Sequence, residues 1–118
     1  LILPFIVQCL IGTNQIIVVE EPEIHLHPKI EADLAELVVW SSNNRSNQFL
    51  IETHSEEFLL RLLKNVRERK IKPKHISINY VDIKKSESKI NKILVQPDGS
   101  YTTPWRDDLF AERTKEFI

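Results

Sequence analysis

Apolar residues along this chain occur in runs and stripes whose spacing changes from one segment to the next. Leu1–Leu10 is almost wholly apolar and predicts a buried helix, which the turn-forming residues Gly12–Asn14 end. Gln15–Val19 and Gln48–Glu52 are short β-type runs and predict two strands. The first run is apolar at successive positions, which is typical of a strand in a parallel sheet that is covered on both faces.

An amphipathic stretch follows each of these strands. The first begins at Pro28, a residue suited to the first turn of a helix, and a polar loop is expected over Ser41–Asn47. The second begins after Ser55, a suitable N-cap, and Pro73 is expected to end it. The apolar stripe of the first helix contains Ile30, Leu34, Leu37, Val38 and Ser41. The stripe of the second contains Phe58, Leu59, Leu62, Leu63 and Val66.

The pattern changes to alternation after Pro73. His75–Asp82 and Lys89–Gln96 predict an antiparallel hairpin, with polar Lys84–Ser88 between its strands. Pro97–Ser100 predicts a turn, and Asp107–Ile118 predicts a final short helix. We therefore divide the chain into an α/β unit over residues 1–74 and a unit of hairpin plus helix over residues 75–118.

The order strand, helix, strand predicts that the first two strands are parallel, because crossovers of this kind are right-handed and return to the same sheet. Glu20 and Glu21 end the first strand, and Thr53 and His54 follow the second. Ligands of open α/β sheets bind outside the carboxyl ends of the strands. These four residues are therefore expected to meet at one edge of the sheet.

Length and composition narrow the class of protein. The chain has 118 residues and a net charge of −1, so it is one domain's worth of chain without a wholly basic surface for nucleic acid. Cys9 is the only cysteine, which excludes an internal disulfide and fits a cytoplasmic location. Leu1–Ile11 is too short for a membrane span and lacks a basic leader. Because the chain starts at Leu1 and contains no methionine, we expect it to be a piece of a longer protein.

The polar residues after the two strands suit the hydrolysis of a nucleoside triphosphate. Glu20 offers a carboxylate to Mg²⁺, directly or through water, and Glu21 can orient an attacking water. His54 can contact the γ-phosphate or the water. Gly12 and Gly99 are the only glycines, so a glycine-rich phosphate-binding loop is absent from this sequence. The chain therefore has the residues of half an ATPase, and we expect no appreciable ATP binding or hydrolysis by the chain alone.

The two motifs resemble one known group of proteins. Val18–Pro28 is similar to the Walker B and D-loop segment of ABC-type AAA ATPases of the OLD (overcoming lysogenisation defect) and SMC-like group. Leu50–Ser55 is similar to the switch-histidine segment of that group, and Leu3–Val7 to the helix that follows its signature motif. The resemblance extends from Ile2 to about Asp82. The tail, with Gly99, Pro104–Trp105 and Phe110, is loosely similar to an uncharacterised C-terminal domain found on some of these ATPases.

This resemblance implies a P-loop-NTPase-like half-domain of the ABC type, with parallel central strands, flanking helices and a C-terminal antiparallel hairpin. It implies that Glu21 is the catalytic glutamate, that His54 is the switch histidine, and that Glu20 assists Mg²⁺. Glu20 stands where aspartate is commonest in ABC proteins. His25 and His27 would belong to the D-loop, which crosses to a partner head.

The implied cofactors, Mg²⁺ and ATP, would bind only to the intact protein. The implied partners are the missing N-terminal half of the head, a second head that sandwiches ATP in a homodimer, and a DNA or nuclease partner.

Two other interpretations of the same residues stay open. One is a metal-binding module, since metal-ligand side chains are frequent here and His25 and His27 could project to one side of an extended segment. The other is a non-catalytic dimerisation module, which would keep the apolar runs without needing Glu21 and His54. The ligand-type residues are Glu20, Glu21, Glu23, His25, His27 and His54.

Overall fold

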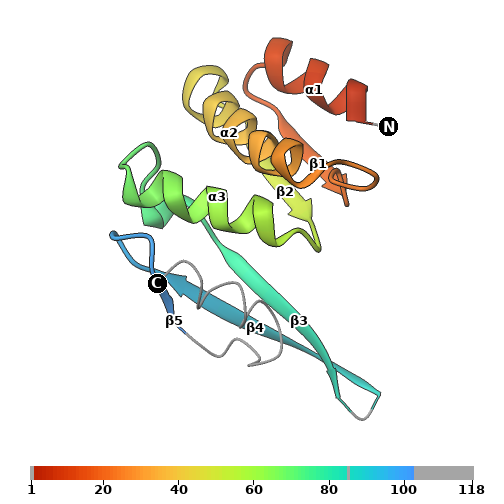
Figure 1. Ribbon diagram of the computed structural model, residues 1–118, viewed down its shortest axis with the longest axis vertical. Helices are drawn as coiled ribbons and strands as arrows, with labels where there is room; N and C mark the ends of the chain where they lie inside the picture. Colours follow the sequence, from red (N-terminus) through yellow and green to blue (C-terminus); the bar gives the residue numbers. More distant parts are fainter. Residues whose placement is uncertain (1, 85, 103–118) are drawn as a thin grey trace.

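The computed structural model describes residues 2–84 and 86–102 as a small α/β structure with two sheets (Figure 1). The predicted helix over Asp107–Ile118 and the tail residues Trp105 and Phe110 lie outside the described residues. None of the described helices combines the length and the apolar content that a membrane crossing requires. The elements are α1 (Ile2–Ile11), β1 (Ile16–Glu20), α2 (Pro28–Arg45), β2 (Gln48–Glu52), α3 (Glu56–Arg67), η1 (Pro73–His75), β3 (Ile78–Lys84), β4 (Glu87–Val95) and β5 (Tyr101–Thr102).

The first sheet consists of β1 and β2, which are parallel as predicted. One face of this sheet packs against the helices α1, α2 and α3 (Figure 1). Burial of a large apolar side chain contributes about 1.5–3 kcal/mol to the free energy of unfolding. This core therefore holds both strands, and with them their carboxyl ends, in one rigid arrangement. Its buried members are Phe5, Cys9, Ile17, Leu34, Ala35, Val38 and Phe58, with Val19, Phe49 and Ile51 partly buried beside them.

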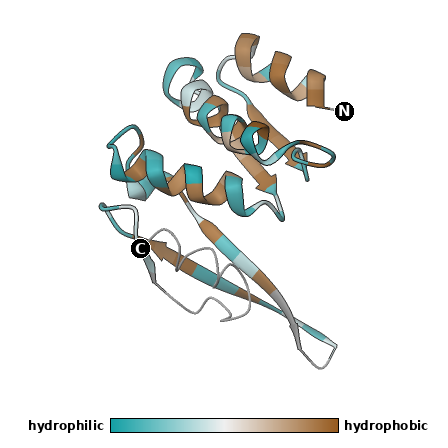
Figure 2. Ribbon diagram, in the orientation of Figure 1, coloured by the Kyte–Doolittle hydropathy of each residue, from teal (hydrophilic) through white to brown (hydrophobic). Residues whose placement is uncertain are grey.

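In the part of the chain that the structure describes, the opposite face of this sheet is open. Ile16, Val18 and Leu50 are 73%, 65% and 65% exposed, although all three are large and apolar. In Figure 2 both strands are coloured largely as hydrophobic, which agrees with this composition. The prediction that β1 is covered on both faces is therefore wrong for the part of the chain that the structure describes. The sequence has the apolar residues for a second layer, but no described element packs on them.

The second difference from prediction concerns Ser41–Asn47, which is not a loop. Helix α2 continues to Arg45, and only Ser46, with a left-handed φ of 54°, ends it. Polar side chains of this segment form hydrogen bonds that a helix can accommodate. Ser41 is fully buried and its Oγ donates to the carbonyl of Cys9 at 2.8 Å, and Arg45 Nε donates to the carbonyl of Leu10 at 2.9 Å. These contacts with α1 replace the solvent that a polar loop would need.

Cys9 lies in the core rather than at a reactive site. Its side chain is fully buried, and this burial raises the pKa of the thiol to about 11. A thiol with a raised pKa carries little thiolate at neutral pH and is a poor nucleophile. Cys9 is therefore a small buried apolar residue of this core.

The second sheet is antiparallel and packs against α3. Ile78 and Ile93 are paired across β3 and β4, and both contact Leu63 of α3 in a second core. The predicted hairpin is confirmed, but its strands are shifted: β3 is one residue shorter than predicted and β4 is one residue longer, and pairing continues to Lys84 and Glu87. The first predicted strand should begin at Ile78, since η1 occupies Pro73–His75. Helix α3 ends at Arg67, six positions before Pro73, and β5 was not predicted.

The turn between β4 and β5 confirms the prediction for Pro97–Ser100 and makes Gly99 sensitive to substitution. Gly99 has a φ of +81°, and a Cβ atom there would lie 2.6 Å from the carbonyl oxygen of Leu63. We expect Gly99→Ala to lower the free energy of unfolding by about 1–2 kcal/mol, because an L-residue is strained at this φ. Urea unfolding measures this change. Gln96→Ala, in the same turn, should change stability by less than about 0.5 kcal/mol. Equal stability of the Gly99 variant and the wild type would contradict the turn geometry.

Candidate functional site

The carboxyl ends of β1 and β2 bring the predicted polar residues to one edge of the sheet. The strands pair in register, so Glu20 lies opposite Glu52. One further bond follows the ladder, in which the N–H of Glu21 donates to the carbonyl of Glu52 at 2.7 Å. The backbone of Glu21 is therefore fixed directly to the neighbouring strand.

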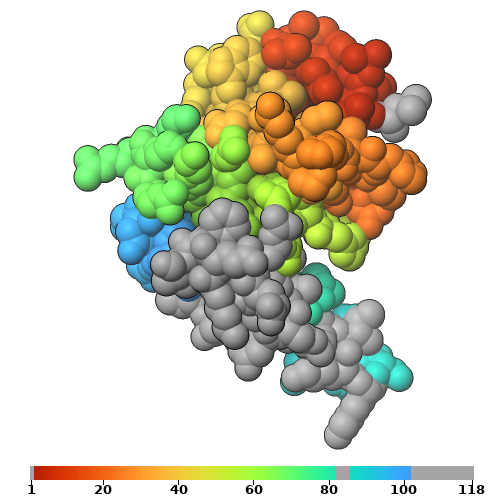
Figure 3. Space-filling view, in the orientation of Figure 1, coloured from red at the N-terminus to blue at the C-terminus, as the bar shows by residue number. Residues whose placement is uncertain are grey.

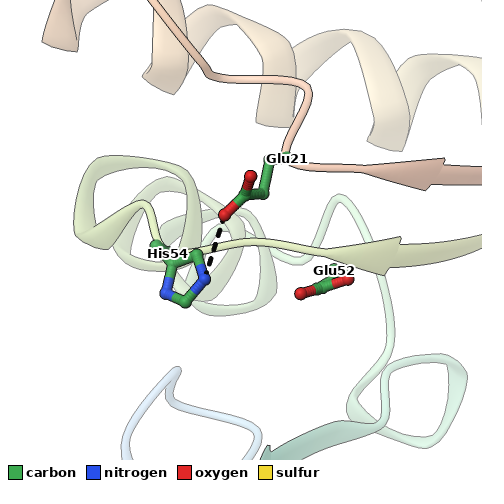
Figure 4. Close-up of side chains that lie close together, drawn as sticks. All are labelled: Glu21, Glu52 and His54. Carbon is green, nitrogen blue, oxygen red and sulfur yellow. Dashed lines mark ion pairs between the residues drawn. The ribbon is translucent and has the colours of Figure 1, made fainter.

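Glu21 and His54 form the closest contact at this edge. Glu21 Oε1 lies 3.1 Å from His54 Nε2, and the dashed line in Figure 4 marks this pair. The side chain of Glu21 is 37% exposed and that of His54 is 77% exposed, so both are accessible to a ligand. The backbone conformation of Glu21 makes its contact with His54 possible. Glu21 has a left-handed φ of 44°, which ends the alternation of the strand and turns its carboxylate toward the segment after β2.

A positive φ at a residue with a long side chain is unfavourable, by about 1–3 kcal/mol. Such conformations are concentrated at functional sites, where the surrounding structure holds them. Here the fixed N–H of Glu21 and the turn after it hold the conformation, since the N–H of Ile24 donates to the carbonyl of Glu21 at 3.2 Å. The strained, left-handed φ therefore distinguishes Glu21 from the other acidic residues that the structure describes.

Glu20 is placed differently from Glu21. Its side chain is exposed and lies on the same side of the sheet as Ile16 and Val18, because side chains alternate along a strand. The carboxylate thus projects from the open face of the sheet, beside Glu52 on the neighbouring strand. Glu20 remains at the edge that the sequence predicts, but its carboxylate is not part of the close group formed by Glu21, Glu52 and His54.

His25 and His27 lie in the segment between β1 and α2. His25 is exposed, with a left-handed φ of 65°, in the turn that covers residues 22–25. His27 is the N-cap of α2, and its Nδ1 accepts a hydrogen bond from the N–H of Lys29 at 3.2 Å. Among the described residues, no group with metal-ligand spacing contains either histidine. The structure therefore gives His27 a capping role and leaves the imidazole of His25 at the surface.

Glu23 anchors this turn to the segment that carries His54. The residue is only 8% exposed. Its Oε1 accepts a hydrogen bond from Thr53 Oγ1 at 2.6 Å, and its Oε2 accepts one from the N–H of His54 at 3.2 Å. Thr53 Oγ1 in turn accepts from the N–H of Ser55 at 3.0 Å. One buried carboxylate therefore fixes the position of His54 relative to Glu21.

Ser55 completes the connection between the helices. It is the N-cap of α3, as predicted, and its Oγ accepts from the N–H of Phe58 at 3.0 Å. The same hydroxyl donates to Glu31 Oε2, in the first turn of α2, at 2.9 Å. The loop after β2 is thus held by both α2 and the turn after β1.

A groove of about 590 Å³ lies beside these residues, between the turn after β1 and the beginning of α3. In the space-filling view the orange turn and the yellow-green start of α3 adjoin at the edge of the molecule (Figure 3). The groove is strongly acidic, and carboxylate oxygen is the ligand that Mg²⁺ prefers. A bare triphosphate would be repelled here unless cations accompanied it. The acidic residues that line it are Glu21, Glu23, Glu31, Glu56 and Glu57.

The sequence analysis did not single out Glu52, and it named Glu23 only as a ligand-type residue and not as an anchor. The signal for Glu52 was present, because two five-residue runs that pair in parallel and both end in glutamate must place these carboxylates side by side. No comparable signal existed for Glu23. Its partners lie thirty and thirty-one positions later in the chain, so only the fold identifies it as an anchor.

Comparison with known proteins gives one match that bears on the class of domain. The family model of the AAA ATPase domain matches residues 7–59 of this chain. The matched segment begins within α1, ends in the first turns of α3, and so contains β1, β2 and every site residue described above. This match supports an AAA-type ATPase fragment, and it is consistent with a P-loop-like fold. No curated protein and no solved structure gave a significant match.

Proposed function

We propose that this chain is the catalytic half of an ABC-type ATPase head of the OLD and SMC-like group. The observation that carries the proposal is the contact between Glu21 and His54, 3.1 Å apart at the ends of adjacent parallel strands. An acid and an imidazole held together at the carboxyl edge of such a sheet can orient a water molecule against a phosphate. The sequence motif over Val18–Pro28 is the basis for the subgroup.

In this proposal Glu21 accepts a hydrogen bond from the attacking water and aligns it with the γ-phosphate. His54 donates to the γ-phosphate or to the water, and so distinguishes a triphosphate from a diphosphate. Mg²⁺, when bound with ATP, neutralises charge on the phosphates. Glu20 would hold Mg²⁺ directly or through water, and its exposed carboxylate is a suitable oxygen donor.

The remaining parts of the active site would come from other segments. The N-terminal half of the same head would supply the phosphate-binding loop, because this sequence has only two glycines. The turn with Glu23–Pro28 would serve as the D-loop and contact a second head, with His25 exposed toward it. Two heads would then sandwich ATP in a homodimer. A cytoplasmic location and a DNA or nuclease partner complete the proposal, as expectations from the resemblance.

The proposal predicts that catalysis needs both halves of the head. Steady-state ATP hydrolysis should be measurable for the longer protein and undetectable for residues 1–118 alone, because nothing in this chain can cradle the phosphates. Phosphate release, measured on both samples at equal concentration, tests this. Turnover by the pure chain that disappears on Glu21→Gln would contradict the need for the other half. Absence of hydrolysis by the longer protein would contradict the proposed function itself.

A further inference from the structure

Three side chains at the carboxyl edge of the first sheet are arranged like the ligands of a metal ion. One ligand atom each from Glu21, Glu52 and His54 lies within 4.8 Å of the others. Figure 4 shows these side chains together, with Glu52 on β2 and His54 in the segment that follows it. The set contains two carboxylates and one imidazole, and thus combines oxygen and nitrogen donors.

The distances suit a small transition-metal ion. Bonds of about 2.0–2.2 Å from such an ion to oxygen or nitrogen place neighbouring ligand atoms about 3–3.5 Å apart in a tetrahedral site. The Glu21 Oε1 to His54 Nε2 distance of 3.1 Å already lies in this range. Glu52 is exposed, so a change of side-chain rotamer can bring its carboxylate to the same separation.

The backbone of each ligand residue is already held in place. The N–H of Glu21 is bonded to the carbonyl of Glu52, which fixes these two residues against each other at 2.7 Å. The N–H of His54 is bonded to the buried carboxylate of Glu23. Metal binding at this position would therefore order side chains only, and the entropic cost of forming the site is small.

The charge of this edge also favours a cation. Glu20 and Glu52 are direct neighbours across the two strands, and like charges in such positions destabilise a sheet. Among the described residues, no lysine or arginine forms an ion pair with either of them or with Glu21. His54 is the one partner that the described ion pairs provide at this edge. A divalent ion would offset this repulsion.

We propose that Glu21, Glu52 and His54 bind a divalent transition-metal ion of the Zn²⁺ type, with the remaining coordination position open to water or to an anion. The imidazole ligand distinguishes this site from one for Mg²⁺, which prefers oxygen donors alone. If the proposed function holds, an ion there occupies both Glu21 and His54 and inhibits ATP hydrolysis. The inhibition rests on the proposed function, whereas the binding of the ion does not.

Titration of the 118-residue chain with Zn²⁺, followed by calorimetry in the presence of excess Mg²⁺, tests the binding. We expect one Zn²⁺ per chain, and we expect Glu52→Gln and His54→Ala each to weaken binding at least about tenfold. Matched controls are Glu20→Gln, opposite Glu52, and His25→Ala, another exposed imidazole. Both should retain binding within about threefold, and circular dichroism should confirm that every variant is folded.

Two results would overturn the metal site. The first is the absence of stoichiometric Zn²⁺ binding by the wild-type chain. The second is a loss of affinity in Glu20→Gln or His25→Ala as large as in Glu52→Gln or His54→Ala. Co²⁺ provides a second readout. Its visible absorption should report a site with a nitrogen ligand, and this absorption should disappear in His54→Ala.

The metal site and the proposed function can fail separately. Zn²⁺ binding by this chain, together with no ATP hydrolysis by the longer protein, would support the metal site and contradict the ATPase. Hydrolysis that depends on Glu21, without Zn²⁺ binding by the chain, would contradict the metal site alone. Where both hold, Zn²⁺ should inhibit the longer protein at a fixed excess of Mg²⁺, and the inhibition should be weaker in Glu52→Gln.

Discussion

The Glu21→Gln substitution in the proposed longer ATPase is expected to lower steady-state ATP hydrolysis by at least about 100-fold. Glutamine has nearly the same size as glutamate, so the left-handed turn and the bond to Glu52 should persist. It cannot, however, accept a proton from the attacking water, and it presents an amide where the carboxylate aligns that water. Phosphate release measures the rate, and size-exclusion chromatography in ATP should show the variant as a stalled dimer.

Asp33→Asn is the matched control for this experiment. Asp33 is an exposed carboxylate on α2, outside the groove and away from the edge of the sheet, so its neutralisation should leave the rate within about twofold. The ATPase proposal predicts a large difference between these two variants. Equal rates for the wild type and the Glu21 variant would mean that the acidic residues at this edge are structural or bind metal, and the catalytic assignment would have to be withdrawn.

The second large effect is expected from Glu23→Ala, which should lower the free energy of unfolding of the chain by about 2–4 kcal/mol. The substitution removes the acceptor for Thr53 Oγ1 and for the N–H of His54. Both donors lie in a part-buried environment, where an unsatisfied donor is costly and water cannot fully replace the carboxylate. Urea unfolding, followed by circular dichroism, measures the change.

Glu23→Gln separates the loss of the hydrogen bonds from the loss of volume. Glutamine retains one acceptor, so we expect this variant to be less destabilised than Glu23→Ala. Asp33→Ala, which removes an exposed carboxylate, should change stability by no more than about 0.5 kcal/mol. If Glu23→Ala is as stable as this control, the buried carboxylate does not anchor the loop, and the placement of His54 must depend on Ser55 and the helix cap instead.

Much of the secondary structure was predictable because its signals are local. Gln48–Glu52 is a strand with the predicted bounds, and Ser55 caps α3 through its own hydroxyl. Pro28 begins α2, as its fixed φ and missing N–H allow at the first turn of a helix. Each of these outcomes depends on residues within a few positions of one another, so the sequence contains the information.

The errors occurred where distant contacts override local preference. Ser41–Asn47 has the composition of a loop, yet Ser41 and Arg45 donate to carbonyls at the end of α1, and the helix continues. The apolar residues at successive positions of β1 predicted two covered faces, whereas the described structure covers only the face of Ile17 and Val19. For the helix the deciding partners lie more than thirty positions away, and for the strand no described element packs on Ile16 or Val18.

The features of the candidate site can likewise be divided into those that the sequence predicted and those that only the structure revealed. The sequence by itself determined that Glu21 and His54 each follow an apolar strand, because the length and composition of such a run are local properties of the chain. Only the tertiary structure decided that ligand atoms of Glu21, Glu52 and His54 lie within 4.8 Å of one another, that Glu23 holds the loop of His54, and that Glu21 adopts a left-handed φ. These features depend on the register between two strands and on a carboxylate buried between segments thirty positions apart. Such contacts between distant segments form only when the core packs.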